Sequence, residues 1–282
     1  MSWIDSTQRE YAFGVSEHDY VLGTEDDEIA RLGLQHRVWR ERALACWDRA
    51  GVCIGSDVLD VGAGPGFASL DLCEIVGESG SVTALERSSR FIESGRARTQ
   101  GRVDYRETDL VLDELPNRQF DVAWCRWVMS FVSDPQLCIA KVAERLKPGG
   151  RFALHEYFDY ATWQFLPDIE PMESFVRETM QSWREAGGEP NIAKTLPSML
   201  ASAGLTVERV SPIFFAMRPR DYAWQWPAAF IRSHAPKFVA GGRFSEENCV
   251  ALLRHLEQAE QNPESILVSP VVMEIIAVKS TG

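Results

Sequence analysis

The sequence predicts an α/β fold in which a doubly wound, mostly parallel sheet is covered by helices on both faces. Two observations carry this prediction. Short apolar segments alternate with helix-like segments across about a hundred residues, and the first apolar segment runs directly into a glycine-rich turn, GAGPG, at 62–66. Strands that alternate with helices pair in parallel through right-handed crossovers, which places helices on both sides of the sheet.

Seven segments have the composition of strands. Each is short, apolar and rich in β-branched or aromatic residues, as buried strands are. The first of them, DVLDV, ends at the glycine turn. The predicted strands are 57–61, 81–86, 102–107, 120–127, 151–158, 205–219 and 265–279.

Helices are predicted before the first strand and between the strands. Residues 24–51 begin with Thr24 as an N-cap, carry acidic residues in the first turn and repeat apolar residues at helical spacing. The helix after the second strand is capped by Ser88 or Ser89. Residues 133–150 form a helix with a proline in its first turn and the string LKPGG as its stop signal.

The alternation of strand and helix stops after the fifth strand, so we expect a core with additions. Two later segments are aromatic and helix-prone, and they interrupt the strands that complete the sheet. The expected organisation is an N-terminal helical lid segment at 1–50, a core at 51–160, helical cap inserts at 161–204 and 221–263, and the last strands at 205–220 and 264–282.

Composition and charge narrow the classes of function. A net charge of −12 disfavours a nucleic-acid groove as the main working surface, because phosphate backbones are bound by Lys and Arg. Six cysteines occur without a C-x-x-C pair, which favours reduced thiols over a disulfide framework or a metal site. We find neither a secretory signal nor an apolar run of about 18 residues, so we expect a cytoplasmic protein that is not inserted in a membrane.

Three interpretations of the glycine turn compete: a P-loop, a dinucleotide loop, and a tight turn that binds no ligand. A P-loop needs G-x-x-x-x-G-K-[ST], which does not occur in this sequence. A dinucleotide loop needs G-x-G-x-x-G, and Phe67 stands where its third glycine would be. The spacing found is G-x-G-x-G, formed by Gly62, Gly64 and Gly66. A tight turn without a ligand is the remaining alternative, although three alternate glycines cost chain entropy.

The acidic residue before the turn, Asp60, favours a ligand with a positive group over one with phosphates. S-adenosylmethionine has an adenosine, a sulfonium and an amino-acid tail, and it lacks phosphate. The string VLDVGAGPG resembles the first motif of class I S-adenosylmethionine-dependent methyltransferases. The resemblance implies a Rossmann-like methyltransferase fold, methyltransferase activity and S-adenosyl-L-methionine as the cofactor. It assigns Asp60, Gly62, Gly64 and Gly66 to the cofactor site.

Further cofactor contacts follow in chain order. Glu86 ends the second predicted strand, where an acidic side chain can accept hydrogen bonds from both ribose hydroxyls; a solvated carboxylate is the alternative. Arg87 follows it. By the resemblance, Asp109 meets the adenine amino group and Leu110 lends its backbone N–H. Arg126 could pair with the cofactor carboxylate, with the substrate, or with a surface carboxylate.

The N-terminal string YVLGTEDDEIARLGLQHRVW is similar to the segment that precedes the first strand in small-molecule methyltransferases of this class. There, a Tyr and a Gln close over the methionine end of the cofactor. Tyr20 and Gln35 are the matching positions in this sequence. A helix that merely packs on the edge of the sheet would explain the same string.

The expected acceptor is a small organic molecule. The Asn/Asp-Pro-Pro-aromatic tetrapeptide of methyltransferases that act on nucleic-acid bases is absent after the fourth strand. The inserts are instead rich in aromatic residues, which favours a flat or apolar acceptor methylated on oxygen or nitrogen. These aromatic residues are Trp163, Phe165, Trp183, Tyr222, Trp224, Trp226 and Phe230. The oligomeric state is left open, with a homodimer as one option.

A general base is needed only if the accepting group carries a proton. His155 and Glu156 end the fifth predicted strand, and because strands alternate their faces we expect one of the two to reach the site. We choose His155 as the candidate catalytic base, with a structural histidine as the alternative. No metal site is expected. Two other functions remain open: a nicotinamide-dependent oxidoreductase and a non-catalytic protein that binds S-adenosylmethionine.

Overall fold

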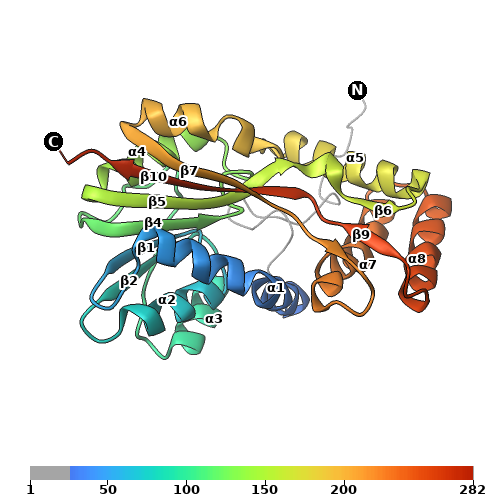
Figure 1. Ribbon diagram of the computed structural model, residues 1–282, viewed down its shortest axis with the longest axis horizontal. Coiled ribbons are helices and arrows are strands. Elements are labelled where there is room, and N and C mark those ends of the chain that lie inside the picture. Colours follow the sequence, from blue (N-terminus) through green and yellow to red (C-terminus); the bar gives the residue numbers. More distant parts are fainter. Residues whose placement is uncertain (1–25, 282) are drawn as a thin grey trace, which may run out of the picture.

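A computed structural model of the chain describes residues 26–281, and it confirms the α/β class. Its main sheet has seven strands in the order β3-β2-β1-β4-β5-β10-β7 (Figure 1). The first five strands in the chain pair in parallel, whereas β10 runs antiparallel to both of its neighbours. The seven strands of the main sheet are β1 (Asp57–Val61), β2 (Ser81–Glu86), β3 (Asp104–Glu107), β4 (Phe120–Arg126), β5 (Leu146–Asp159), β7 (Leu205–Ile213) and β10 (Val271–Lys279).

Helices cover both faces of this sheet, as a doubly wound fold requires. On one face lie α1 (Asp26–Ala50), α2 (Phe67–Val76) and α3 (Ser89–Thr99). On the other lie α4 (Pro135–Glu144) and α6 (Leu196–Ser202). Successive side chains of β1 point to opposite faces of the sheet, so Val58 packs toward α1 and Leu59 packs toward α4. None of the helices within 26–281 is long and apolar enough to cross a membrane.

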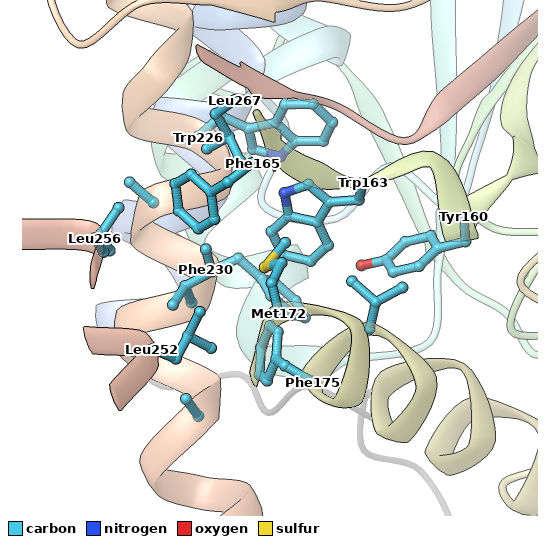
Figure 2. Packing of buried hydrophobic residues seen from close by; sticks show 14 of the residues in the cluster. Tyr160, Trp163, Phe165, Met172, Phe175, Trp226, Phe230, Leu252, Leu256 and Leu267 are labelled. Atoms are coloured by element: carbon cyan, nitrogen blue, oxygen red, sulfur yellow. The ribbon is translucent and has the colours of Figure 1, made fainter. Parts of the chain in front are cut away.

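Beyond one end of the sheet, the later segments form a cap with its own core. A three-stranded sheet of β6 (Gln164–Leu166), β9 (Ile266–Val268) and β8 (Ala216–Met217) joins α5 (Glu170–Glu185), α7 (Gln225–Ala240) and α8 (Glu246–Gln261). Figure 2 shows the buried side chains at its centre, among them Trp163, Phe175 and Phe230. The short 3-10 helices are η1 (Tyr160–Thr162), η2 (Ile192–Lys194) and η3 (Tyr222–Trp224).

The cap differs from the two helical inserts that the sequence predicts. The segments predicted as single strands at 205–219 and 265–279 each divide between the main sheet and the small one. Ser269 marks the division, because its hydroxyl accepts the backbone N–H of Phe215 at 2.9 Å. Moreover, α6 lies within the predicted insert 161–204 but packs on the main sheet through Leu196 and Leu200.

The predicted helix at 133–150 is shorter than expected. It ends at Glu144, and the LKPGG string lies inside β5, where Leu146 pairs with Phe120. The register shifts before Val122 pairs with Arg151, so the glycines occupy an irregularity at the start of a strand. The strand therefore begins five residues before the predicted 151.

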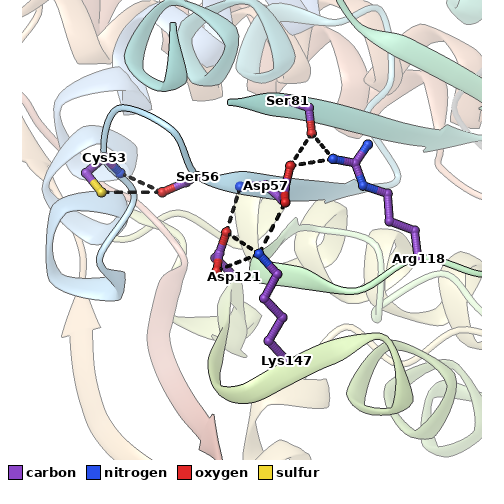
Figure 3. Close-up of polar contacts among 7 residues, drawn as sticks. All are labelled: Cys53, Ser56, Asp57, Ser81, Arg118, Asp121 and Lys147. Atoms are coloured by element: carbon purple, nitrogen blue, oxygen red, sulfur yellow. Dashed lines mark hydrogen bonds and ion pairs between the residues drawn. The ribbon is translucent and has the colours of Figure 1, made fainter. Parts of the chain in front are cut away.

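Ion pairs fasten the amino-terminal edge of the sheet, as Figure 3 shows. Lys147 at the start of β5 lies 2.9 Å from Asp121 of β4 and 3.2 Å from Asp57 of β1. Arg118 and the Ser81 hydroxyl also bond to Asp57. This network occupies the edge opposite the glycine turn, so the carboxyl ends of the strands remain the edge at which a ligand binds in such folds.

Candidate active site

A cavity of about 370 Å³ lies at the carboxyl ends of β1, β2 and β4. Three segments form most of its wall: the glycine turn, residues 108–112 and residues 126–133. Helix α1 closes it from the side through Leu32, Gln35 and His36. The cavity is therefore at the strand-order switch point where the sequence places a ligand.

The glycines of the turn have different roles. Gly64 lines the cavity at φ +55°, and a Cβ added there meets no atom within 4 Å, so its backbone is open to a ligand. Gly62 also lines the cavity, whereas Gly66 does not. A Cβ on Gly66 would stand 2.1 Å from the Tyr105 hydroxyl and 2.9 Å from Gly95. Gly66 thus allows α2 to approach α3, and its predicted place in the cofactor site is not supported.

Two buried carboxylates flank the turn. Asp60 accepts a hydrogen bond from Ser69 Oγ at 2.6 Å, and burial raises its pKa to about 6 against that bond and the charge of Arg126. Glu86 accepts the backbone N–H groups of Gly64, Arg87 and Ser88, each at 2.9 Å, while burial raises its pKa. A carboxylate has about four acceptor positions, so Glu86 holds the turn and retains capacity for a ligand hydroxyl.

A chain of three side chains supports Arg126 in the cavity wall. Arg126 Nη2 lies 3.1 Å from His36 Nδ1, and His36 Nε2 lies 3.0 Å from Asp71 Oδ2. Because a guanidinium can only donate, Nδ1 is the acceptor and the imidazole proton stands on Nε2, facing Asp71. Burial lowers the pKa of Arg126 to about 10 and lowers that of His36. Arg126 Nη1 is buried without a partner, which is costly unless a ligand supplies one.

His36 is a cavity residue that the sequence analysis missed. It is adjacent to Gln35, which the sequence predicts as a cofactor residue. Arg40, one helical turn after His36, also binds Asp71, at 2.7 Å. The sequence does contain a signal for this site: a His and an Arg at i, i+4 in the first helix, and an aspartate in the helix after the glycine turn. That signal is weak, because pairing across two helices is visible only once α1 is placed against α2.

The other predicted cofactor residues have defined places. Arg87, Asp109 and Leu110 line the cavity, and Asp109 Oδ1 accepts the N–H groups of Val111 and Leu112 at 2.8 and 3.0 Å. That carboxylate therefore also shapes its own turn. Gln35 lines the cavity as well. Tyr20 lies outside the described residues.

The side chains of this cavity fit S-adenosylmethionine. The unpartnered nitrogen of Arg126 suits a carboxylate, and Asp60 suits a positive group. Glu86 has acceptor capacity left for a hydroxyl, and the open backbone of Gly64 allows a close approach. These groups lie in one cavity whose volume is in the usual range for ligand sites.

A second cavity, of about 30 Å³, which we call the aromatic cavity, shares Gln35, Trp127 and Phe131 with the first. Eight of its twelve lining residues are aromatic, and they come from the loop after β4, the end of β5, residues 160–163, α5 and α7. The Trp127 ring lies at 18° to the rings of both Tyr157 and Trp226, with centroids 5.4 and 5.7 Å away. Trp226 Nε1 donates to Gln35 Oε1 at 3.0 Å, which links the walls of the two cavities.

Glu156 anchors the loop that both cavities share. Its carboxylate accepts the backbone N–H groups of Val128 and Met129 at 2.7 and 2.8 Å and the Ser130 hydroxyl at 2.8 Å. Burial raises its pKa to about 7 against these hydrogen bonds. The side chain is fully buried and lines neither cavity, so its part is to hold the loop rather than to contact a ligand.

The structure does not bring His155 to the site. His155 is fully buried, lines neither cavity, and lies against Trp39 and Trp124 on the α1 side of the sheet. Its Nε2 is 3.4 Å from Glu274, a carboxylate that Arg49 and Arg209 also bind. The expectation of a catalytic base at His155 is therefore corrected: alternation along β5 points it into the core, opposite to Glu156.

Cys46, His155 and Glu274 come close enough to be considered as metal ligands, with their ligand atoms within 4.8 Å of one another. The two guanidinium groups on Glu274 already neutralise that carboxylate. Burial alone would raise the pKa of Glu274, but the hydrogen bonds from His155 and Arg49 outweigh that effect and lower the pKa to about 2. We interpret this cluster as an ion-pair network that ties α1, β7 and β10 together.

Comparison with known proteins adds an independent line of argument. A family model described as "Methyltransferase domain" matches residues 59–154. The chain is 24% identical over 185 residues to the ubiquinone/menaquinone biosynthesis C-methyltransferase UbiE of Francisella tularensis subsp. novicida, a match that covers 60% of this chain and 73% of that protein. UbiE of Pseudoalteromonas translucida is 25% identical, over 60% and 72% of the two chains.

Solved structures share the fold at low identity. Phosphoethanolamine N-methyltransferase 2 of Haemonchus contortus, in complex with S-adenosylhomocysteine, superposes with a TM-score of 0.58 and 17% identity over 95% of this chain and 61% of that one. The [4+2]-cyclase SpnF superposes with a TM-score of 0.54 and 19% identity over 86% and 82%. The second likeness shows that this fold also occurs in a protein named for a different reaction.

Proposed function

We propose that this chain, a class I S-adenosylmethionine-dependent methyltransferase, methylates an oxygen or nitrogen of a small aromatic or apolar molecule. One observation carries the proposal. The aromatic cavity shares a wall with the larger cavity through Gln35, Trp127 and Phe131, so an acceptor placed there would adjoin the cofactor.

We assign the polar groups of the larger cavity to the parts of S-adenosylmethionine. Arg126 binds the carboxylate of the methionine tail, and Asp60 stands near its positive end. Glu86 accepts one ribose hydroxyl, while Asp109 and the N–H of Leu110 meet the adenine. Each of these residues lines the cavity, and the two interior charges have opposite sign, as a ligand with an ammonium and a carboxylate requires.

S-adenosylmethionine, when bound by Arg126, Asp60 and Glu86, would supply an electrophilic methyl group to a lone pair of the acceptor, with the sulfonium sulfur as the leaving group. The protein's own contribution is to position the acceptor and to exclude water. Glu156 does this indirectly by holding the loop at 127–131. We assign no base, so an acceptor proton leaves to solvent or before transfer.

A carbon acceptor is the second candidate. The UbiE relatives are named as C-methyltransferases, and an electron-rich ring carbon would occupy the same aromatic cavity. Their low identity, 24–25%, does not transfer the substrate. The position of a transferred label on the product, read by NMR, separates the three acceptor atoms.

A nicotinamide-dependent oxidoreductase is disfavoured by the surroundings of Phe67. This residue stands at the third position of the dinucleotide pattern, and its ring lies 3.7 Å below the guanidinium of Arg98 and 5.9 Å from the ring of His36. A Cβ on Gly33 would meet the same ring at 2.7 Å. The side chain is thus packed as part of the cavity wall.

The test of the proposed function has two stages. We expect calorimetric titration to give binding of S-adenosylmethionine and S-adenosylhomocysteine but not of NAD. A methyl-labelled donor should then label members of a panel of small phenols, amines and apolar metabolites. Tighter binding of NAD would overturn the methyltransferase assignment of the cavity. Cofactor binding without transfer to any acceptor would instead favour a non-catalytic or SpnF-like role.

A further inference from the structure

The aromatic cavity contains hydrogen-bond donors that have no partner. Among the described side chains that line it, the indole nitrogens of Trp127 and Trp163 are buried and unbonded. Both side chains are more than nine-tenths buried, at 6% and 3% exposure. An indole nitrogen can only donate, and leaving a buried donor unpaired is costly. A ligand that brings an acceptor atom would remove this cost.

The remaining polar groups of the cavity agree with a ligand that accepts hydrogen bonds. No carboxylate occurs among the lining residues of the described chain, and the one charged group is the guanidinium of Arg31. Arg31 donates to both oxygens of Glu28 at 2.7 Å and to Gln35 at 3.1 Å. A cationic amine would therefore enter a cavity that holds a positive group and no free anion. An oxygen acceptor, neutral or anionic, is complementary to it.

The backbone of Trp127 is a second, independent sign of a built site. Its φ is +53°, in the left-handed region that bulky side chains rarely adopt. The surrounding contacts keep it there: its N–H donates to the carbonyl of His155 at 3.0 Å, and Glu156 fixes the next two residues. Such local strain is found most often where a side chain must be presented to a ligand.

We propose that the aromatic cavity binds the oxygen acceptor of a planar ring, which receives hydrogen bonds from the indole groups of Trp127 and Trp163, while the ring itself extends along the wall shared with the larger cavity. This inference rests on the proposed function and deepens it, because it names the acceptor class as planar rings that carry a carbonyl or hydroxyl oxygen in addition to the atom that is methylated, rather than cationic amines. The bonded oxygen is distinct from the atom that is methylated, which must face the larger cavity.

The volume of the cavity limits the ligand to a small ring. At about 30 Å³ it holds little more than one water molecule, so the ring enters along the shared wall and partly occupies the larger cavity. Gln35 and Phe131 are the partly buried members of that wall, whereas Trp127 is buried. Monocyclic probes are therefore the appropriate ones.

Three probes of similar size separate the possible chemistries. Acetophenone carries a carbonyl acceptor, α-methylstyrene is its isostere without the oxygen, and benzylamine is a cation. Ligand-observed NMR titration of the full chain, saturated with S-adenosylhomocysteine, should show acetophenone binding about three- to tenfold more tightly than α-methylstyrene, the effect of one or two hydrogen bonds. Benzylamine should bind most weakly.

Tryptophan-to-phenylalanine variants locate the effect. Trp163→Phe and Trp127→Phe should each reduce the preference for acetophenone over α-methylstyrene, because phenylalanine has no N–H to donate, whereas the change in ring size affects both isosteric probes alike. Trp47→Phe is the matched control, because Trp47 also has a buried, unpaired indole nitrogen but lines neither cavity. Its affinities should match those of the unmodified protein.

The outcomes distinguish this inference from the proposed function. Equal binding of acetophenone and α-methylstyrene, or tightest binding of benzylamine, overturns the oxygen-acceptor assignment while cofactor binding stands. An equal loss of acetophenone affinity in Trp47→Phe overturns the placement in this cavity. Failure to bind S-adenosylhomocysteine at all would strike the proposed function instead.

Discussion

The two cavities share three residues but are built in opposite ways. The larger one is made of backbone turns and charged side chains, most of which lie between Asp60 and Ser133 in the chain. The smaller one is made of aromatic rings that five separate segments contribute. The difference teaches that a cofactor shared by many enzymes can be recognised through a local motif. An acceptor is recognised by side chains that only the complete tertiary structure brings together.

Their polar groups differ in the same way. In the larger cavity the buried carboxylates Asp60 and Glu86 already have hydrogen-bond partners in the protein. In the smaller cavity two buried donors have none. The carboxylates of the larger cavity are thus organised before a ligand arrives, and Arg126 Nη1 is its unpaired donor, whereas the aromatic cavity has two unpaired donors and no such carboxylate.

The loop at 127–131 forms part of the wall of both cavities, and we expect the loss of its anchor, Glu156, to lower the stability of the protein. Glu156→Ala removes the acceptor of three hydrogen bonds and leaves buried donors unpaired, so we expect the free energy of unfolding to fall on the order of 3 kcal/mol. Urea denaturation measures it. Glu156→Gln keeps one acceptor oxygen and should lose less. An alanine variant as stable as the unmodified protein would show that the loop is held by packing alone.

A change at the glycine turn should affect the larger cavity only. Gly64→Ala places a methyl group into the open space of that cavity, and we expect cofactor affinity to fall at least tenfold, or by about 1.4 kcal/mol. Gly101→Ala is the control, since Gly101 also has a positive φ and an open Cβ position but lies outside both cavities. Both variants should lose similar stability. Calorimetric titration that finds equal affinities in the two would contradict the placement of the cofactor.

The hydrogen bond between Trp226 and Gln35 tests whether the cavities act separately. Trp226→Phe removes the donor to Gln35 and part of the ring that stacks on Trp127, so we expect acetophenone affinity to fall about threefold through looser packing of the aromatic wall, with cofactor affinity nearly unchanged. Trp224→Phe, which loses a bond to Glu260 outside both cavities, is the control. An equal loss of cofactor affinity in Trp226→Phe would mean that the two cavities form one unit.

The smallest expected effect is a pH dependence of cofactor binding. Burial raises the pKa of Asp60 to about 6, so the carboxylate is ionised above this pH and gains a proton as pH falls through it. A positively charged group prefers the ionised form, and affinity should fall about twofold between pH 7.5 and pH 6. Asp60→Asn should remove this dependence. A steeper fall in the variant would point to another titrating group.

What the sequence predicts well is what depends on neighbouring residues. The glycine turn, Asp60 and the strand and helix on either side of the turn follow from apolar runs and from spacing within a single strand, turn and helix. Glu86 could be located from its distance along the chain. The same spacing predicts Gly66 as a cofactor residue, but in the structure the missing side chain of Gly66 makes room for the Tyr105 hydroxyl at the start of α2.

What the sequence does not predict depends on contacts between distant segments. The face of β5 on which His155 lies is decided by its pairing with β4 and β10, and one residue of register would exchange it with Glu156. The strands β6, β8 and β9 have two or three residues each, too few for a periodic pattern. The left-handed backbone of Trp127 follows from the anchoring of its loop and has no local signal.

The position of β10 between β5 and β7 constrains the order in which the chain can fold as it is synthesised. Both neighbours are translated earlier, and within the main sheet β7 pairs with β10 alone. Until residues 271–279 have left the ribosome, β7 has no partner in that sheet and β5 has an open edge. The nascent chain therefore presents two unpaired strand edges that can aggregate with other chains. A chaperone that shields nascent chains would act during this interval.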